Sequence, residues 1–147
     1  MKTLNHAEIL LIEDSEYDAE MTMLALKDNH VTNNVLWFQD SEEALAFLFR
    51  EGKYSQESAE HAIRLILLDL KMPKVNGLEI LEKLKNNEKT KSIPVVMLTS
   101  SKEEKDIAKS YELGVNSYIV KPVEFDKFTK AIADTGLYWT LLNQTDY

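Results

Sequence analysis

The sequence predicts a single-domain α/β fold, with five parallel strands in a doubly wound sheet and helices on both faces. Short apolar runs lie at residues 8–12, 34–38, 65–68, 93–98 and 117–120, and a segment with helical spacing of apolar residues follows each of them. Strict alternation of strand and helix indicates a parallel sheet between two helical layers. The run at 65–68 is wholly aliphatic, as expected of a strand that is buried on both sides.

Length and composition fit one globular domain over residues 1–147, with a core at about 8–135. Hydrophobic residues make up 44% and charged residues 29%, which is typical of globular proteins. No run approaches the roughly 20 apolar residues of a membrane span, and the first six residues lack the apolar segment of a signal peptide. We therefore expect a cytoplasmic protein without membrane contact, and no separate output domain.

Charge and cysteine content exclude several kinds of function. A net charge of −8 argues against nucleic-acid binding, which normally needs a basic surface. The same charge is compatible with binding of a cation or of a basic partner. The absence of cysteine excludes disulfides, thiolate catalysis and cysteine-ligated zinc.

The first strand ends in the acid pair Glu13 and Asp14, and a helix should follow it at once. Ser15 can cap this helix, with Asp18 in the capping-box position. Its buried face is predicted to carry apolar residues at helical spacing, namely Ala19, Met23 and Leu26.

Two further capping boxes predict the starts of the second and third helices. Asp40 with Glu43 opens the second helix, Gly52 closes it as residue C′, and Asn76 with Glu79 opens the third. The apolar positions that follow these starts are Ala44, Leu45 and Leu48 in the second helix and Ile80, Leu81 and Leu84 in the third.

The last two strand–helix units follow the same pattern. The fourth strand has Pro94 near its start, where a missing N–H is tolerated, and ends at Thr99. Ser101 with Glu104 should cap the fourth helix, and the fifth should begin near Glu124. The apolar positions are Ile107, Ala108 and Tyr111 in the fourth helix and Phe125, Phe128 and Ile132 in the fifth.

An apolar tail at 136–147 continues the spacing of the last helix, with Leu137, Tyr138, Trp139 and Leu142. Two roles are open for these residues. They cover the domain's own core, or they form part of a homodimer contact across the fifth helix.

The residues that carry chemistry gather at the carboxyl ends of the strands, where open α/β sheets bind their ligands. Asp69 ends the central strand abruptly, and Glu13, Asp14, Thr99 and Lys121 end three others. Carboxylates at ~4 Å in an effective dielectric near 20 repel one another by roughly 4 kcal/mol per pair, so such a cluster needs a cation or a shared proton. Oxygen-only ligands favour Mg²⁺.

Together with such a cation, Lys121 and Thr99 would complete a receptor for a phosphoryl group built on Asp69. Each residue alone allows a simpler interpretation. Asp69 could cap the next turn, Glu13 and Asp14 could cap a helix, and Thr99 could do the same.

The chain resembles the response-regulator receiver domains of two-component signalling from about residue 9 to residue 132. The motifs that carry the resemblance are Glu13-Asp14, Leu68-Asp69 with Met72-Pro73 and Asn76-Gly77 downstream, Leu98-Thr99-Ser100, and Lys121-Pro122. The resemblance implies a flavodoxin-like sheet with strand order 2-1-3-4-5. It also implies that a histidine kinase or a histidine phosphotransfer protein supplies the phosphoryl group.

The resemblance assigns the phosphoacceptor and a metal site. Asp69 would accept the phosphoryl group. Asp14 and Asp69 would bind Mg²⁺ directly, Glu13 would bind it through water, and the backbone carbonyl of Lys71 would complete the protein ligands.

It also assigns a switch. Lys121 would pair with the phosphate, and its bond to Pro122 would be cis. Thr99 would move to bond the phosphate while Tyr118 moves inward, which would alter the surface of the fourth helix, fifth strand and fifth helix. Lys71 and Ser101 flank the site, where they either modulate phosphate lifetime or are merely solvated loop residues.

A narrower resemblance is to the stand-alone receivers of bacterial and cyanobacterial phytochrome kinases. It rests on the polar loop at 53–61, on the region around Trp139 and on the lack of an output domain. It implies a photoreceptor kinase as phosphodonor.

Two other classes of function remain as alternatives to a phosphoacceptor that catalyses only its own phosphorylation and dephosphorylation. A magnesium-dependent phosphatase with an aspartate nucleophile needs a second acid two residues later, and that position holds Lys71. A pseudo-receiver that binds partners without phosphorylation has usually lost the acceptor, the acid pair or the lysine, and all of these are present.

Overall fold

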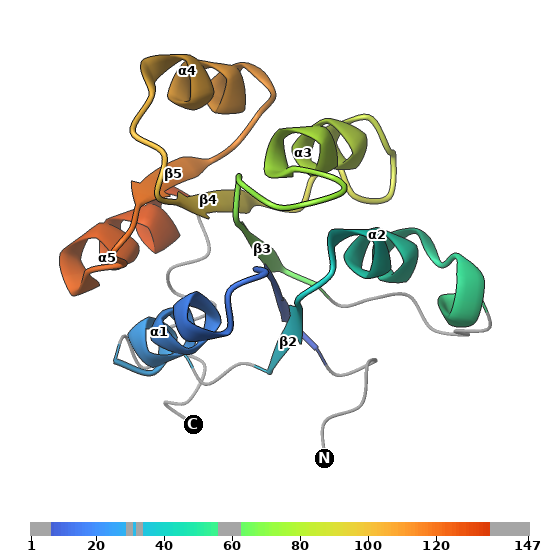
Figure 1. The fold of residues 1–147 in the computed structure, drawn as a ribbon, viewed down its shortest axis with the longest axis horizontal. Coiled ribbons are helices and arrows are strands. Elements are labelled where there is room, and N and C mark those ends of the chain that lie inside the picture. Colours follow the sequence, from blue (N-terminus) through green and yellow to red (C-terminus); the bar gives the residue numbers. More distant parts are fainter. Residues whose placement is uncertain (1–6, 29–30, 32–33, 56–62, 136–147) are drawn as a thin grey trace.

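The computed structural model describes residues 7–28, 31, 34–55 and 63–135. Five parallel strands form one sheet in the order β2-β1-β3-β4-β5 (Figure 1), so the predicted fold class and strand order are confirmed. The strands are β1 (Ile9–Ile12), β2 (Val35–Phe38), β3 (Leu65–Leu68), β4 (Val95–Thr99) and β5 (Ser117–Val120). The helices are α1 (Glu16–Asp28), α2 (Ser41–Phe49), the short 3-10 helix η2 (Gly52–Tyr54), α3 (Gly77–Lys85), α4 (Glu104–Glu112) and α5 (Phe125–Asp134).

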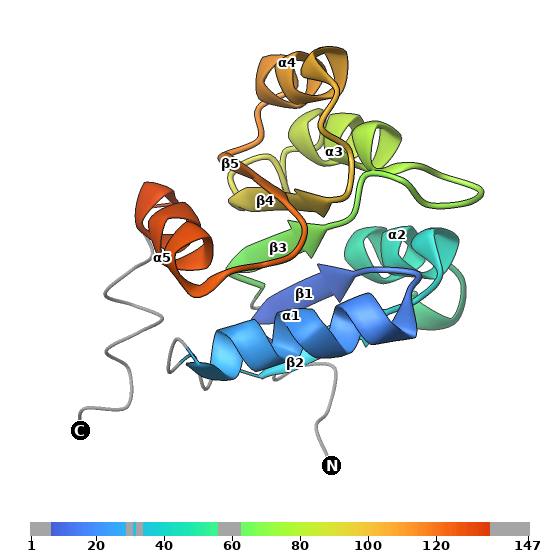
Figure 2. The ribbon, with the colours of Figure 1, turned by 60° about the vertical axis from the view of Figure 1, so that its left-hand side comes forward.

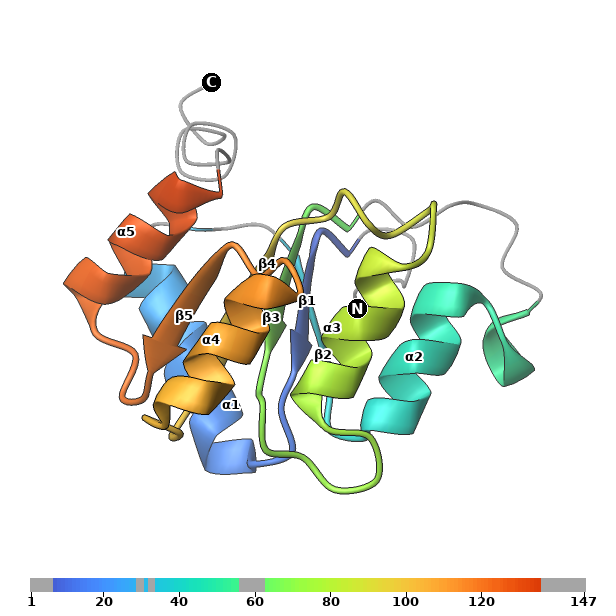
Figure 3. The same ribbon diagram turned by 90° about the horizontal axis from the view of Figure 1, so that it is seen from above.

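Helices cover both faces of the sheet (Figures 2 and 3). α1 and α5 lie on one face, and α2, α3 and α4 lie on the other. Alternate residues of each strand point to opposite layers, so Leu65 and Leu67 pack with Phe128 of α5. Ile66 and Leu68 pack on the opposite side, in the core that α2 and α3 cover. The central strand is therefore apolar throughout because both of its faces are buried.

The predicted helix starts have mixed outcomes. Asn76 and Glu79 form the expected capping box at α3. At α2 the Asp40 side chain accepts from two backbone N–H groups, but the Glu43 carboxylate accepts from Tyr54 instead of closing the box.

Two expected caps are wrong. The left-handed residue that ends α2 is Arg50 with φ 56°, whereas Gly52 begins η2. The N-cap of α4 is Glu103, not Ser101, because the Ser101 hydroxyl donates to the Asp106 carboxylate inside the helix's first turn.

Most expected core positions are buried. Ala19, Leu26, Phe128 and Ile132 are inside, while Met23 is only half-buried. α4 departs from the pattern, because its buried residues are polar and its apolar residues Ala108 and Tyr111 are exposed. The expected inward Phe125 side chain and the tail at 136–147 lie outside what the structure describes, so the two roles suggested for that tail stay predictions.

No helix within the described residues is long and apolar enough to cross a membrane.

Candidate functional site

Three carboxylates meet at the carboxyl edge of the sheet. Glu13 and Asp14 follow β1, Asp69 follows β3, and one ligand oxygen from each lies within 4.8 Å of the others. Glu13 and Asp69 are buried and Asp14 is partly exposed. The adjacency follows from the parallel pairing of β1 with β3, in which Ile12 is the partner of Leu68.

The loop after Asp69 is held close to the start of α3. The backbone N–H of Gly77 donates to the Leu70 carbonyl over 2.8 Å. A Cβ at residue 77 would lie 2.5 Å from the Asp69 carbonyl oxygen, so only glycine fits there. Gly77 thus lets α3 begin directly against the backbone of the central aspartate.

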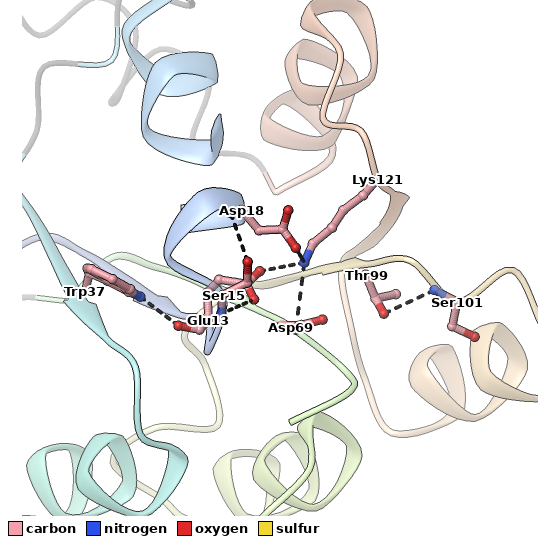
Figure 4. Close-up of polar contacts among 8 residues, drawn as sticks. All are labelled: Glu13, Ser15, Asp18, Trp37, Asp69, Thr99, Ser101 and Lys121. Carbon is pink, nitrogen blue, oxygen red and sulfur yellow. Dashed lines mark hydrogen bonds and ion pairs between the residues drawn. The ribbon is translucent and has the colours of Figure 1, made fainter. Parts of the chain in front are cut away.

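Lys121 reaches into the acid cluster from the end of β5 (Figure 4). Its ammonium lies 2.6 Å from Glu13 Oε1, 2.8 Å from Asp18 Oδ2 and 3.8 Å from Asp69 Oδ2. The peptide bond between Lys121 and Pro122 is cis. One ammonium is therefore shared by three carboxylates, and the nearest two are not the central aspartate.

The carboxylates of this cluster are buried with too little positive charge nearby, which shifts their pKa values. Burial raises the pKa of Glu13 to about 7, although Lys121 opposes the shift, and the Asp69 charge adds to it. Burial likewise raises the pKa of Asp69, against the effect of Lys121. A bound cation would reverse both shifts, because it favours the ionised carboxylates.

Thr99, Ser101 and Tyr118 line the β4 and β5 side of the site. Thr99 is fully buried and its hydroxyl accepts from the Ser101 N–H over 3.3 Å. The Tyr118 hydroxyl donates to the Ser101 carbonyl over 3.0 Å, and its ring is half-buried. The two residues expected to act as a switch are thus joined through one residue of the β4–α4 loop.

Another buried carboxylate, outside the acid cluster, lies beside this loop. Asp106 of α4 accepts from the Ser101 hydroxyl over 2.6 Å, and Lys71 Nζ lies 3.4 Å from the same oxygen. Lys71 is exposed and lies in the loop after Asp69. Its pairing with Asp106 therefore links that loop to α4.

Residues 9–133 match the response regulator receiver domain family. The chain belongs to this family. The response regulator Rcp1 of Synechocystis sp. is 37% identical over 131 residues, which cover 89% of this chain and 87% of Rcp1. The bacteriophytochrome response regulator RtBRR is 51% identical with a TM-score of 0.81, covering 93% of this chain and 82% of the RtBRR chain. The Mn²⁺-bound form of Rcp1 gives a TM-score of 0.73 at 35% identity, covering 95% and 96%. The chain is therefore a phosphoacceptor response regulator of two-component signalling, similar to phytochrome response regulators.

The receiver domain brings together the residues that the sequence pointed to: Glu13, Asp14, Asp69, Thr99 and Lys121 lie at one edge, and Tyr118 bonds the loop that follows Thr99. The sequence interpretation gave Asp18 only a capping role, and its N–H does donate to Ser15 Oγ over 3.2 Å. Its carboxylate, however, binds Lys121. Its position in the first turn of the helix that directly follows the acid pair could have suggested this, because that turn begins beside the carboxyl edge of the sheet.

Three other residues of the site gave no such signal. Trp37 and Gln39, at the end of β2, donate to the backbone of the acid pair, and Asp106 binds Ser101. The Trp37 and Gln39 contacts depend on tertiary placement, whereas Asp106 lies only five residues after Ser101, across the start of α4.

The donor set fits a hard divalent cation. All three ligand groups are carboxylates, and no His or Cys joins them among the described residues. Their mutual repulsion is only partly offset by Lys121, which leaves the cluster short of positive charge.

Proposed function

We propose that Asp69 is the residue on which this receiver domain carries its phosphoryl group. One observation supports this most. The Asp69 carboxylate is buried among acids, yet lies 3.8 Å from the Lys121 ammonium. An acyl phosphate carries roughly −1.5 to −2 of charge, more than the carboxylate it replaces, and an acceptor therefore needs a cation within reach. Attack of the Asp69 carboxylate on a phosphohistidine forms the O–P bond as the P–N bond breaks and returns the electron pair to the imidazole.

We also propose Mg²⁺ as the cofactor, held by Glu13, Asp14, Asp69 and the Lys71 backbone carbonyl. The all-oxygen donor set favours this ion, and the Mn²⁺-bound form of Rcp1 supports a divalent site in a similar chain. When bound, the ion would offset charge on the transferred oxygens. The chain's own contribution is Lys121, which would move from its carboxylate partners towards the new phosphoryl oxygens.

The output would run through Thr99 and Tyr118. The Thr99 hydroxyl would turn to donate to the phosphoryl group, which would release its contact with the Ser101 N–H. Tyr118, bonded to the same loop residue, would follow inward. The surface formed by α4, β5 and α5 would change as a result.

A histidine kinase is the proposed phosphodonor, either directly or through a histidine phosphotransfer protein. The similarity to RtBRR and Rcp1 supports a phytochrome-type kinase. Rates of transfer from several phosphorylated kinases to this chain, measured side by side, would test that choice. Faster transfer from kinases unrelated to phytochromes would contradict it.

The acceptor is tested by labelling with radioactive acetyl phosphate in the presence of Mg²⁺. Asp69→Asn should abolish incorporation, because the nucleophilic carboxylate is gone. Asp40→Asn is the matched control, since it removes an aspartate outside the acid cluster, keeps a capping side chain at α2 and should leave labelling near the wild-type level. Unchanged labelling of Asp69→Asn would reject the assignment.

A further inference from the structure

The two backbone carbonyls of the acid pair are each held by a side chain from the end of β2. The Trp37 indole Nε1–H donates to the Glu13 carbonyl over 2.8 Å (Figure 4), and Gln39 Nε2 donates to the Asp14 carbonyl over 3.0 Å. The Glu13 N–H also donates to the Phe38 carbonyl over 3.1 Å. Three consecutive residues of one strand end therefore fix the two peptide units that carry the acids.

These carboxylates need such restraint. Their oxygens lie within 4.8 Å of one another and of Asp69, where like charges repel. The peptide units of residues 13 and 14 can rotate to relieve that repulsion, which would carry the carboxylates apart. A side-chain donor on each carbonyl opposes the rotation.

Trp37 and Gln39 differ in burial, yet both donate to a backbone carbonyl of the acid pair. The indole is half-buried against the core on the α1 and α5 side, where a buried N–H requires an acceptor. Gln39 is exposed, so water could satisfy its amide. It nevertheless bonds the next carbonyl of the same loop.

We propose that Trp37 and Gln39 are positioning residues that hold the acid pair ready for its cation. Neither side chain belongs to the acid cluster; each acts through the backbone of Glu13 or Asp14. The inference rests on the proposed Mg²⁺ site, and its test must therefore separate the two.

Trp37→Phe keeps an aromatic ring and removes the N–H, and Gln39→Met keeps the length of the side chain and removes the amide. Tyr54→Phe is the matched control, because it removes the hydroxyl that donates to Glu43, which is not among the acids of the metal cluster. Calorimetric titration with MgCl₂ gives the dissociation constant of each protein, and melting without Mg²⁺ gives its stability.

We expect Trp37→Phe and Gln39→Met each to weaken Mg²⁺ binding by about three- to tenfold, the loss that one hydrogen bond implies. The double variant should lose more. Tyr54→Phe should bind as the wild type does, although it also loses one hydrogen bond.

Wild-type affinity for Mg²⁺ in both Trp37→Phe and Gln39→Met would overturn the proposal, as would an equal loss of affinity in Tyr54→Phe. If the wild type binds Mg²⁺ no better than Asp14→Ala, the proposed metal site fails and the positioning role fails with it. If only Asp14→Ala loses binding, the metal site stands and the positioning role is rejected.

Fluorescence provides a second readout of Mg²⁺ binding. The sequence has two tryptophans, so Trp139→Phe leaves Trp37 as the single emitter. Mg²⁺ should alter its emission, and Gln39→Met in that background should shift the midpoint by the same factor as in calorimetry. Emission that ignores saturating Mg²⁺ would contradict coupling between the indole and the acid pair.

Discussion

Asp69 and Asp106 are both buried aspartates, with 5% and 7% of their surfaces exposed, yet their electrostatics are opposite. Burial raises the pKa of Asp69. The Ser101 hydroxyl holds the pKa of Asp106 below its ordinary value, despite burial, and Lys71 adds to the effect. Low exposure alone therefore does not decide how a carboxylate behaves in this molecule, because Asp69 lies far deeper among protein atoms than Asp106 does.

The balance of donors and acceptors adds to this difference. Asp106 has a hydroxyl at 2.6 Å and an ammonium at 3.4 Å. Asp69 shares one ammonium with Glu13 and Asp18, and Asp14 adds another negative charge nearby. Residues at functional sites commonly break the rules that stabilise the rest of a fold. The incomplete neutralisation of Asp69 is consistent with a site that binds a cation and a phosphoryl group, whereas Asp106 is already satisfied.

Equivalent substitutions at these aspartates provide the sharpest test of this contrast. Asp106→Asn should lower the free energy of unfolding by about 1 kcal/mol, because a charge-assisted hydrogen bond becomes a neutral one. Asp69→Asn should raise it by about 1 kcal/mol without Mg²⁺, because burial disfavours the ionised carboxylate more than the attraction of Lys121 favours it. Urea unfolding of both variants in EDTA measures the two effects. Destabilisation of equal size in both would remove the contrast.

Magnesium should stabilise the protein through the acid cluster around Asp69, and Asp106 should play no part in that effect. At ten times its dissociation constant the ion should stabilise the wild type by about 1.4 kcal/mol, since it binds the native state. Asp14→Ala should lose most of that gain, while Asp106→Asn should keep it. Melting temperatures with and without MgCl₂ provide the measurement, and an equal rise in wild type and Asp14→Ala would place the ion elsewhere.

The pH dependence should follow Glu13. Its pKa of about 7 in the folded protein lies above its ordinary value of 4.5, so the native state holds a proton that the unfolded chain has released. Stability should therefore fall as pH rises towards and through 7. Between pH 6 and 8 the loss amounts to about 1 kcal/mol without Mg²⁺.

Glu13→Gln serves as the control, because it has no such proton to lose and should show a flatter profile. Saturating Mg²⁺ should reverse the wild-type trend, since the ion binds the ionised acids. Parallel profiles for wild type and Glu13→Gln in EDTA would show that another group causes the pH dependence.

The sequence was sufficient for the sheet and for the acids at its edge. Alternating strands and helices fix a parallel order, and the residues after each strand then share one edge, which is why Asp69, Glu13 and Lys121 could be grouped. It was not sufficient where a polar side chain had two possible partners. Ser101 was expected to cap α4 but donates to Asp106, and the Asp18 carboxylate binds Lys121.

Those errors share a physical cause. A capping box contributes about 1 kcal/mol, so a charged partner outcompetes it. That partner is five residues away in sequence for Ser101 and lies at the end of β5 for Asp18. Gly52 shows a related limit: a glycine after a helix favours a left-handed C′, yet Arg50 adopts the left-handed conformation two residues earlier. The end of α2 depended on the short helix η2, which the spacing of apolar residues did not predict.

Lys71 follows Asp69 in the chain and pairs with Asp106, so it links the two aspartates. Its substitution should have the smallest effect of those predicted here. Its ammonium pairs with Asp106 at 3.4 Å, and its side chain is 57% exposed, so the pair itself contributes little to stability. A phosphoryl group on Asp69 would compete for that ammonium through its greater charge. Once there, the ammonium would offset charge on the phosphoryl oxygens and obstruct attacking water.

Lys71→Ala should then accelerate the decay of phospho-Asp69 by about two- to fivefold, the range that a surface charge pair of 0.4–1 kcal/mol implies. Lys74→Ala is the matched control in the same loop, because Lys74 pairs with Asp40 and Glu42 instead. Decay is followed after removal of the phosphodonor. An unaltered rate in Lys71→Ala, or the same change in both variants, would mean that the Lys71–Asp106 pair has no influence on the phosphorylation site. A specific effect of Lys71 would instead make Asp106 its resting partner, so that the balance of charge around one aspartate sets the lifetime of the phosphate on the other.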